Sequence, residues 1–391
     1  MQTSLTQALL QTPAGQEADE ILRNCVHCGF CNATCPTYQL TGDELDGPRG
    51  RIYQIKQVLE GRQATRKTQQ HLDRCLTCRA CETTCPSGVD YHRLLDTGRD
   101  MVERSVQRSP GDRLVRRALR MLLPWPGRFA PLLRMGQFVR PLLPTALRQH
   151  VPEKQVSKQT APARHHARIM LLLDGCVQPS LAPQINSATV RVLDALGITA
   201  ISEKSSGCCG AVSYHLNAAD EARACMRTNI DAWWPAIEKG AEAIIVTASG
   251  CAPMVKEYGH LLAEDSAYAD KAKRVSELAR DISEISTAEF SREAFAETGG
   301  GTRIAFHSPC TLQHGQRITG KVEDILTRLG FKLTSVSNSH LCCGSAGTYS
   351  ILEPALSAAL RDSKLATLLA NRPGGWCRTM PLSPGDFPRW G

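Results

Sequence analysis

Two cysteine runs with the same spacing constrain this 391-residue chain more than any other feature. Each run reads Cys-x2-Cys-x2-Cys-x3-Cys-Pro, and the second begins 50 residues after the first. The first run contains Cys25, Cys28, Cys31 and Cys35, and the second contains Cys75, Cys78, Cys81 and Cys85. Three thiolates spaced three residues apart on a tight loop match three corners of a cube, and a more distant cysteine supplies the fourth. The pattern therefore predicts two [4Fe–4S] clusters.

The fourth cysteine of each run is expected to serve the cluster of the other run, as in two-cluster ferredoxins. One cluster is then held by Cys25, Cys28, Cys31 and Cys85, and the other by Cys75, Cys78, Cys81 and Cys35. The proline after each fourth cysteine delays the next helix and fixes where that ligand leaves the loop. Structural zinc is the alternative, but zinc sites usually pair two Cys-x2-Cys units with two ligands from each. The grouping in threes favours iron–sulfur.

From Arg168 onward the chain alternates expected strands and helices, which indicates an α/β arrangement with largely parallel strands. A unit of strand, Cys, helix, strand, Cys-Cys-Gly and helix occurs twice, with 32 residues between the first cysteine and the cysteine pair in both copies. The first copy contains Cys176, Cys208, Cys209 and Cys251, and the second contains Cys310, Cys342 and Cys343. This self-similarity predicts a duplicated domain.

Nearly all of these cysteines lie where strands end or loops begin, which is where α/β folds place ligand sites. Adjacent cysteines are too strained to form a disulfide easily, so Cys-Cys-Gly favours metal or redox use, with Gly210 and Gly344 allowing close backbone approach. Burial as small hydrophobic residues is the alternative. Cys225, inside an expected helix, is interpreted as core packing.

The second copy is expected to be incomplete. The strand before Cys251 has no counterpart after Cys343, where the sequence LANRPGGWCRTMPLSPGDFPRWG is rich in Pro, Gly and Trp. Residues from about Asn371 are therefore predicted to form a tail without the final sheet strand, through truncation, a change of reading frame or divergence. Cys377 stays an alternative fourth ligand for the second copy.

Several residues beside the cysteines are candidates for tuning a cluster. His27, His307, His314 and His340 are placed to hydrogen-bond to sulfur, with a satisfied or surface histidine as the alternative for each. Between the two runs, Arg49 and Arg51 are candidates to offset the negative charge of the clusters, with plain turn residues as the alternative.

The cysteine content and the N-terminal sequence indicate the redox state of the compartment in which the chain works. Seventeen cysteines in 391 residues is well below the density of a short disulfide-rich secreted chain, and residues 1–24 lack the pattern of a secretory signal. A reducing compartment is expected, where cysteines are metal ligands more often than disulfides. Since no G-x-G-x-x-G follows an expected strand and no P-loop is present, no flavin or nucleotide is expected on this chain.

Basic charge is concentrated in one segment. Eleven arginines and three acidic residues between Arg99 and His150 account for the whole net charge of +8. Prolines break its apolar runs, and none approaches the roughly 18 residues that span a bilayer, so short amphipathic helices are expected. The segment is predicted to lie on an anionic membrane leaflet or an acidic partner subunit. Nucleic acid is not expected, because interleaved aromatic residues and a known binding motif are missing.

The fold class is mixed: an N-terminal α-helical ferredoxin-like domain for two [4Fe–4S] clusters, and a C-terminal α/β duplicated cysteine-rich domain. The predicted boundaries are 15–98 for the ferredoxin-type domain, 99–167 for the Arg-rich helical segment and linker, 168–260 for the first Cys-Cys-Gly unit, 300–370 for the incomplete second unit and 371–391 for the tail.

The segments CVHCGFCNATCPTYQLTGDELDGPRGRIYQIKQVLEG and HLDRCLTCRACETTCPSGVDYH, with the two Cys-Cys-Gly units, closely resemble the iron–sulfur subunits of bacterial glycolate oxidases. The resemblance covers about residues 15–370. The cysteine runs are shared with subunits of anaerobic glycerol-3-phosphate dehydrogenase, lactate-utilisation proteins and heterodisulfide reductases. The stretches that narrow the resemblance to the glycolate oxidase family are DELDGPRGRIY, DAWWPAIEKGAEAI and SHLCCGSAGTY. Relatives of the heterodisulfide reductase type end each unit with Cys-x2-Cys. This chain has only Cys251 in the first unit and no matching cysteine in the second, so whether these units bind an additional cluster stays open.

The resemblance implies the electron-transfer subunit of a glycolate dehydrogenase complex, with no catalytic residue or substrate site on this chain. FAD-containing partner subunits would oxidise glycolate to glyoxylate, with D-lactate as a further substrate. This chain would pass the electrons to quinone or another membrane acceptor, peripherally on the cytoplasmic face of the inner membrane. The alternatives are the equivalent subunit of another flavin-linked dehydrogenase, for lactate or glycerol 3-phosphate, and a redox-sensing binding protein.

Overall fold

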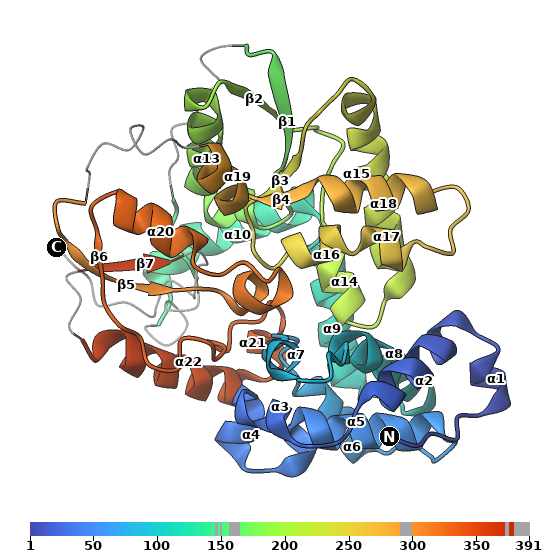
Figure 1. The fold of residues 1–391 in the computed structure, drawn as a ribbon. Helices are drawn as coiled ribbons and strands as arrows, with labels where there is room; N and C mark the ends of the chain where they lie inside the picture. The colour runs from blue at the N-terminus through green and yellow to red at the C-terminus, as the bar shows by residue number, and fades with distance from the viewer. Residues whose placement is uncertain (145–147, 149–150, 156–164, 290–298, 372–374, 379–391) are drawn as a thin grey trace. The chain divides into compact units, whose positions relative to one another are not determined.

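The computed structural model describes residues 1–391 except 145–147, 149–150, 156–164, 290–298, 372–374 and 379–391 (Figure 1). Most of the predicted linker and the end of the predicted tail therefore lie outside the described residues. The chain divides into two compact units. The first comprises Met1–Val115, Ile304–Thr319 and Thr334–Cys377, and the second comprises Arg116–Arg303, Gly320–Leu333 and Arg378–Gly391.

The first unit begins with helices that flank the two cysteine runs. Helix α2 starts at a proline whose fixed φ suits the first turn, and Thr12 caps it by accepting a hydrogen bond from the Gly15 amide. The helices between residues 7 and 105 are α1 (Gln7–Leu10), α2 (Pro13–Asn24), α3 (Phe30–Ala33), α4 (Pro36–Thr41), η1 (Glu44–Asp46), α5 (Pro48–Leu59), α6 (Arg66–Asp73), α7 (Ala80–Thr84) and α8 (Tyr91–Ser105). Helix α9 (Pro110–Leu122) follows and contains the boundary between the two units.

The core of this helical part lies between α2, α5 and α8. Leu22, Ile55 and Leu94 are fully buried there, and Cys25 and Cys81 belong to the same apolar cluster. The cysteine runs are thus held against a packed core, which fixes the positions of their loops.

The second unit is built on a four-stranded sheet with the order β2–β1–β3–β4. The strands are β1 (Arg168–Leu173), β2 (Ile198–Ile201), β3 (Ile244–Val246) and β4 (Ala279–Asp281), and all three pairings are parallel. In the register, Leu171 of β1 lies opposite Ile201 on one side and Ile244 on the other. The predicted parallel α/β arrangement is confirmed, with β4 as an additional strand that the sequence did not predict.

Helices cover both faces of this sheet, as its continuous apolar strands require. Leu171 and Leu173 pack with Trp233 of α15, whereas Met170 and Leu172 pack with Leu193 of α13 on the opposite face (Figure 1). The remaining helices of the second unit are α10 (Pro126–Val139), η2 (Arg140–Leu142), α12 (Gln178–Leu181), α13 (Pro183–Ala195), α14 (Ala211–His215), α15 (Ala219–Glu238), α16 (Ala252–Lys256), α17 (Tyr258–Leu261), α18 (Ala269–Leu278), α19 (Ile282–Glu289) and α20 (Lys321–Arg328).

The second cysteine-rich copy forms a three-stranded sheet with the order β6–β5–β7. Its strands are β5 (Arg303–His307), β6 (Lys332–Leu333) and β7 (Gly375–Arg378), and its helices include η4 (Thr311–Gly315), α21 (Tyr349–Leu352) and α22 (Pro354–Leu369). Strand β7 lies next to β5, as β3 lies next to β1 in the first sheet. The prediction that residues after about Asn371 supply no strand is therefore wrong, and Cys377 lies within β7. Strand pairing depends on backbone hydrogen bonds, so a segment without β-branched residues can extend a sheet.

Candidate iron–sulfur site

The two cysteine runs fold into the same loop. Residues at matching positions of both runs have left-handed backbone: His27 and Thr77 have φ of 59° and 51°, and Gly29 and Arg79 have φ of 86° and 59°. These positive φ values turn the chain back on itself between successive cysteines, which lets the thiols of one run point inward together. Three of these four residues are not glycine, so each loop is held in a conformation that L-residues rarely adopt.

Each loop borders a cavity. The first cavity is lined by Cys25, Cys28 and Cys31 of the first run and by Cys85 of the second run. The second cavity is lined by Cys75, Cys78 and Cys81 of the second run and by Cys35 of the first. The structure thus brings together the two groups of four cysteines proposed from the sequence, with the fourth cysteine exchanged. Cys81 and Tyr91 line both cavities, so a single wall separates them.

Without a metal, burial favours the neutral thiol form of the cysteines around these cavities. Burial raises the pKa of the Cys31 thiol to about 12, and the neighbouring Cys25 and Cys85 add to the shift. Burial also raises the pKa of Cys78 and of Cys81 well above the ordinary range. A bound metal reverses this effect, because it deprotonates the thiols that coordinate it. Four converging sulfur atoms per cavity therefore fit the donor set of a [4Fe–4S] cluster.

The cysteines of the first Cys-Cys-Gly copy also converge. Hydrogen bonds of the Cys208 thiol to Cys176, Cys209 and Cys225 raise its pKa, and Cys209 also bonds Cys251. The interpretation of Cys225 as core packing is therefore incomplete, because its thiol belongs to this group. Nothing in the sequence marked it, since it lies inside α15 rather than at a strand end.

Two buried polar residues that the sequence analysis missed hold the Cys208–Cys209 turn. Asn229 donates to the Cys208 carbonyl at 2.9 Å, and the Tyr258 hydroxyl donates to the Cys209 carbonyl at 2.9 Å. Asn229 also donates to the Tyr258 oxygen at 3.1 Å. Both lie on helices among other polar and charged residues, so nothing in the sequence distinguished them.

The cysteines of the second copy pack against the second cavity within the first unit. Cys310 and Cys342 form an apolar cluster with Leu76, and Cys78 packs against it. The charge of Cys342 contributes to raising the pKa of Cys78. A long-range hydrogen bond of 2.9 Å joins Thr83, beside the second cavity's loop, to Nδ1 of His314. The second copy is therefore a neighbour of this cavity, which spacing in the sequence alone did not predict.

The four candidate histidines have different surroundings. His27 lines the first cavity, and burial lowers its pKa. The Nε2 of His314 donates to the His340 carbonyl at 2.9 Å and its Nδ1 bonds to the Thr83 hydroxyl, so both ring nitrogens are engaged with oxygen and not with sulfur. His307 is placed beside Cys343, whose pKa it helps to hold down against the larger effect of Cys342.

The glycine of each Cys-Cys-Gly motif is required by both conformation and space. Gly210 and Gly344 have φ of 94° and 80°, and a Cβ would lie 3.0 Å from the Ala222 carbonyl oxygen and 2.5 Å from the Ser357 carbonyl oxygen, respectively. This agrees with the close backbone approach predicted for both.

Gly344→Ala is expected to destabilise the protein by roughly 2 kcal/mol or more, because the left-handed conformation alone costs an L-residue about 1–2 kcal/mol. Gly210→Ala has more space and should cost less. Thermal unfolding of both variants measures this, and an equal or smaller loss for Gly344→Ala would contradict the prediction.

Known domain families and known proteins match most of the chain. Residues 21–89 match the 4Fe-4S dicluster domain family, and residues 170–256 and 304–373 match the cysteine-rich domain family CCG. The glycolate oxidase iron-sulfur subunit of Escherichia coli (strain K12) is 57% identical over 373 residues, which cover 95% of this chain and 91% of that protein. The probable glycolate oxidase iron-sulfur subunit of Bacillus subtilis (strain 168) is 28% identical over 377 residues, covering 89% and 84%.

A more distant relative matches only part of the chain. Lactate utilization protein A of Anoxybacillus flavithermus is 27% identical over 194 residues, which cover 49% of this chain and 78% of that protein. The chain has two cysteine-lined cavities and a duplicated cysteine-rich fold, and its similarity to the Escherichia coli subunit extends along nearly its whole length. It therefore belongs to the family of glycolate oxidase iron–sulfur subunits.

Proposed function

We propose that this chain carries electrons between the flavin-bearing subunits of a glycolate-oxidising complex and a membrane acceptor. The ligands of its two [4Fe–4S] clusters are then Cys25, Cys28, Cys31 and Cys85 at the first cavity, and Cys75, Cys78, Cys81 and Cys35 at the second. The observation that carries this proposal is the pair of cavities, in which three cysteines of one run meet the fourth cysteine of the other run, with Cys81 lying in the wall between the two. When bound, such clusters take up and release one electron at a time.

The residues of this chain give the two positions different surroundings. Cys28 is exposed at the first cavity, whereas Cys78 packs against buried residues of the second Cys-Cys-Gly copy. Tyr91 lies in the wall shared by both cavities, and its hydroxyl donates to the Cys75 sulfur at 3.7 Å. The arrangement supports a path from the exposed first position to the buried second one.

The substrate follows from the names of the relatives and from electron balance. Oxidation of glycolate to glyoxylate releases two electrons and two protons, which the flavin of a partner subunit accepts together. Quinone takes up two electrons and two protons, so two one-electron positions on this chain suffice to connect the two reactions. D-Lactate is a further substrate with the same 2-hydroxy acid chemistry.

A test uses the complex assembled from this chain and its flavin-bearing partners. Glycolate-dependent quinone reduction should require this chain, and Cys78→Ala should abolish it while glycolate still reduces the flavin. Val26→Ala, at an exposed position in the loop of the first run, is the control and should retain the activity. Quinone reduction that is undiminished without this chain would contradict the proposed function.

The Arg-rich segment is less uniformly exposed than its composition predicts. Arg99, Arg108 and Arg116 are buried, and Arg120 forms an ion pair with Glu221 at 2.9 Å. The exposed residues of the segment in the second unit include arginines and large apolar residues: Arg117, Met121, Trp125, Arg128, Leu132, Arg134, Met135, Phe138 and Leu142. Among the described residues, no helix combines the length and the apolar character needed to cross a bilayer. We infer that residues 117–142 contact an anionic lipid surface at the cytoplasmic face of the inner membrane.

Phe138→Glu with Leu142→Glu is expected to weaken binding to vesicles containing anionic lipid by at least about tenfold, because both side chains would otherwise enter the lipid. Phe138 and Leu142 are 84% and 85% exposed, so the fold should tolerate the change. Vesicle co-sedimentation measures the effect, with Arg104→Glu, on the first unit, as the control. Equal binding by the double variant and the wild type would show that this surface is only solvated.

A further inference from the structure

Two arginines of α5 face the two cavities in different ways. Arg49 lines the first cavity, its side chain is 35% exposed, and it forms a 2.6 Å ion pair with Glu44. Arg51 lines the second cavity, and its side chain is 1% exposed. The charge of Arg49 is therefore offset by its own carboxylate and by solvent, whereas Arg51 acts inside the protein.

The hydrogen bonds of Arg51 go to neutral groups, and its contact with a carboxylate is longer. Its Nε donates to the His71 carbonyl at 2.7 Å and its guanidinium donates to the Thr37 hydroxyl at 3.2 Å, and neither partner carries a formal charge. The carboxylate of Asp46 is 3.7 Å from the guanidinium.

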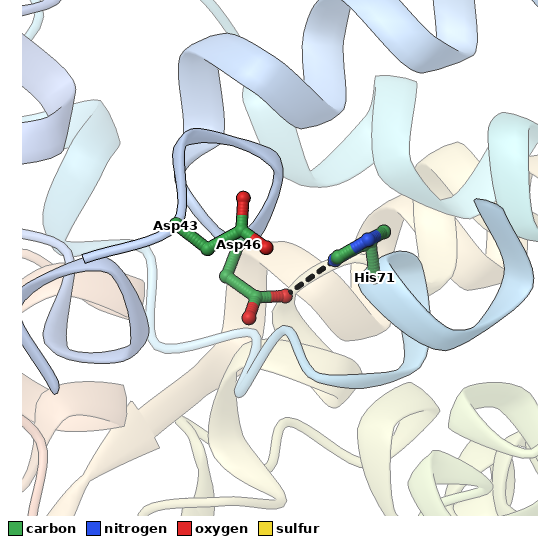
Figure 2. A group of neighbouring side chains, drawn as sticks. All are labelled: Asp43, Asp46 and His71. Carbon is green, nitrogen blue, oxygen red and sulfur yellow. Dashed lines mark hydrogen bonds and ion pairs between the residues drawn. The ribbon is translucent and has the colours of Figure 1, made fainter. Parts of the chain in front are cut away.

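Asp46 is shared with other groups. Its oxygens accept from Arg74 at 2.9 Å and lie 2.8 Å from Nδ1 of His71, as Figure 2 shows for the histidine. One buried carboxylate thus faces two guanidinium groups. Asp43, Asp46 and His71 stand close together, but both Asp46 oxygens already bond to cationic or N–H groups, so this trio acts as an ion-pair hub.

A second buried cation, Arg99, contacts the backbone of the second run. Arg99 is buried and donates to the carbonyl oxygens of Leu72, at 2.8 Å, and of Cys75, at 2.9 Å. These carbonyls hold the guanidinium against the backbone of a ligand cysteine without offsetting its charge. The second run therefore has two buried guanidinium groups beside it, against the buried carboxylate of Asp46 and the charge of Glu82, which acts on Cys81.

We propose that Arg51 is a positioning residue for electron transfer that raises the reduction potential of the cluster at the second cavity. The inference rests on the proposed function. Reduction adds a negative charge to a buried site, which burial alone disfavours, and a buried cation opposes that cost strongly because the local dielectric is low. The net charge around a cluster is one of the terms that set its potential. Arg51 thereby keeps the buried position reducible from the exposed one.

The test is an anaerobic redox titration of the purified protein, followed by electron paramagnetic resonance. In Arg51→Gln, the reduction potential of one of the two one-electron steps should fall by at least about 59 mV, a tenfold change in its equilibrium constant. The potential of the other step should not change. Asp46→Asn removes the offsetting carboxylate and should shift the same step upward. Arg51→Lys keeps the charge and should shift it by less than half as much as Arg51→Gln. Arg49→Gln is the matched control and should leave that step in place.

The opposite signs make the test independent of a general loosening of the fold. Asp46 keeps Arg74 and His71 as partners in Arg51→Gln, so that variant should retain its iron. Two clusters with unchanged potentials in Arg51→Gln, or shifts of the same sign in Arg51→Gln and Asp46→Asn, would overturn the inference while leaving the proposed function intact. Wild-type protein without an iron–sulfur signal would instead overturn the proposed function.

Discussion

Replacing Cys28 with Ala should remove one of the two clusters, which lowers the iron content from about eight to about four atoms per chain. Cys28 is exposed, so the change removes a ligand with little loss of packing. The remaining cluster should also become more labile, because Cys35 and Cys85 cross between the two sites. Cys78→Ala should remove the other cluster. Val26→Ala, in the same loop and 68% exposed, is the control that should keep all the iron.

The crossing of the fourth ligands has its own signature. Cys85→Ala should abolish the same spectroscopic signal as Cys28→Ala, although Cys85 belongs to the second run. Cys35→Ala should abolish the same signal as Cys78→Ala. If each variant instead matches the other cysteines of its own run, the ligand sets are not exchanged.

Trp233→Ala is expected to destabilise the protein by about 3–5 kcal/mol, the range for truncating a buried large aromatic side chain. Trp233 is fully buried and packs in the core between β1 and β3 of the four-stranded sheet and the helices that cover it. A loss of this size is a large fraction of the stability of an ordinary domain. Chemical denaturation of the holoprotein, followed by circular dichroism, measures it.

Trp233→Phe provides the matched control. The indole Nε1 of Trp233 is buried and has no hydrogen-bond partner among the described residues. Phenylalanine keeps most of the ring and removes this unsatisfied group, so the cost should be well below half that of Trp233→Ala. Similar losses in both variants would mean that the packing of the ring is not what stabilises this core.

The sequence predicted well those features that depend on local spacing. The exchange of Cys35 and Cys85 could be proposed because the loop geometry repeats with the same spacing, and the structure indeed places each beside the other run. The parallel strands β1, β2 and β3 were predicted because buried strands give short continuous apolar runs. The family assignment was also confirmed, by relatives that match nearly the whole chain.

Features that depend on tertiary context were beyond the sequence. The residues of strand β7 gave no sign of a strand in the sequence. The segment is a strand because its backbone pairs with β5. Arg49 and Arg51 were equivalent candidates in the sequence, and only packing distinguishes the half-buried Arg49, closely paired with Glu44, from the fully buried Arg51. The position of Cys225 beside Cys208 likewise depends on where α15 packs.

The most direct test of the central claim is a count of iron, acid-labile sulfide and zinc in the anaerobically purified protein, together with its absorption spectrum. The account predicts about eight iron and eight sulfide per chain from the two cavities, with a broad sulfur-to-iron absorption band that bleaches on reduction. Zinc bound at the cysteines without iron or sulfide would contradict it.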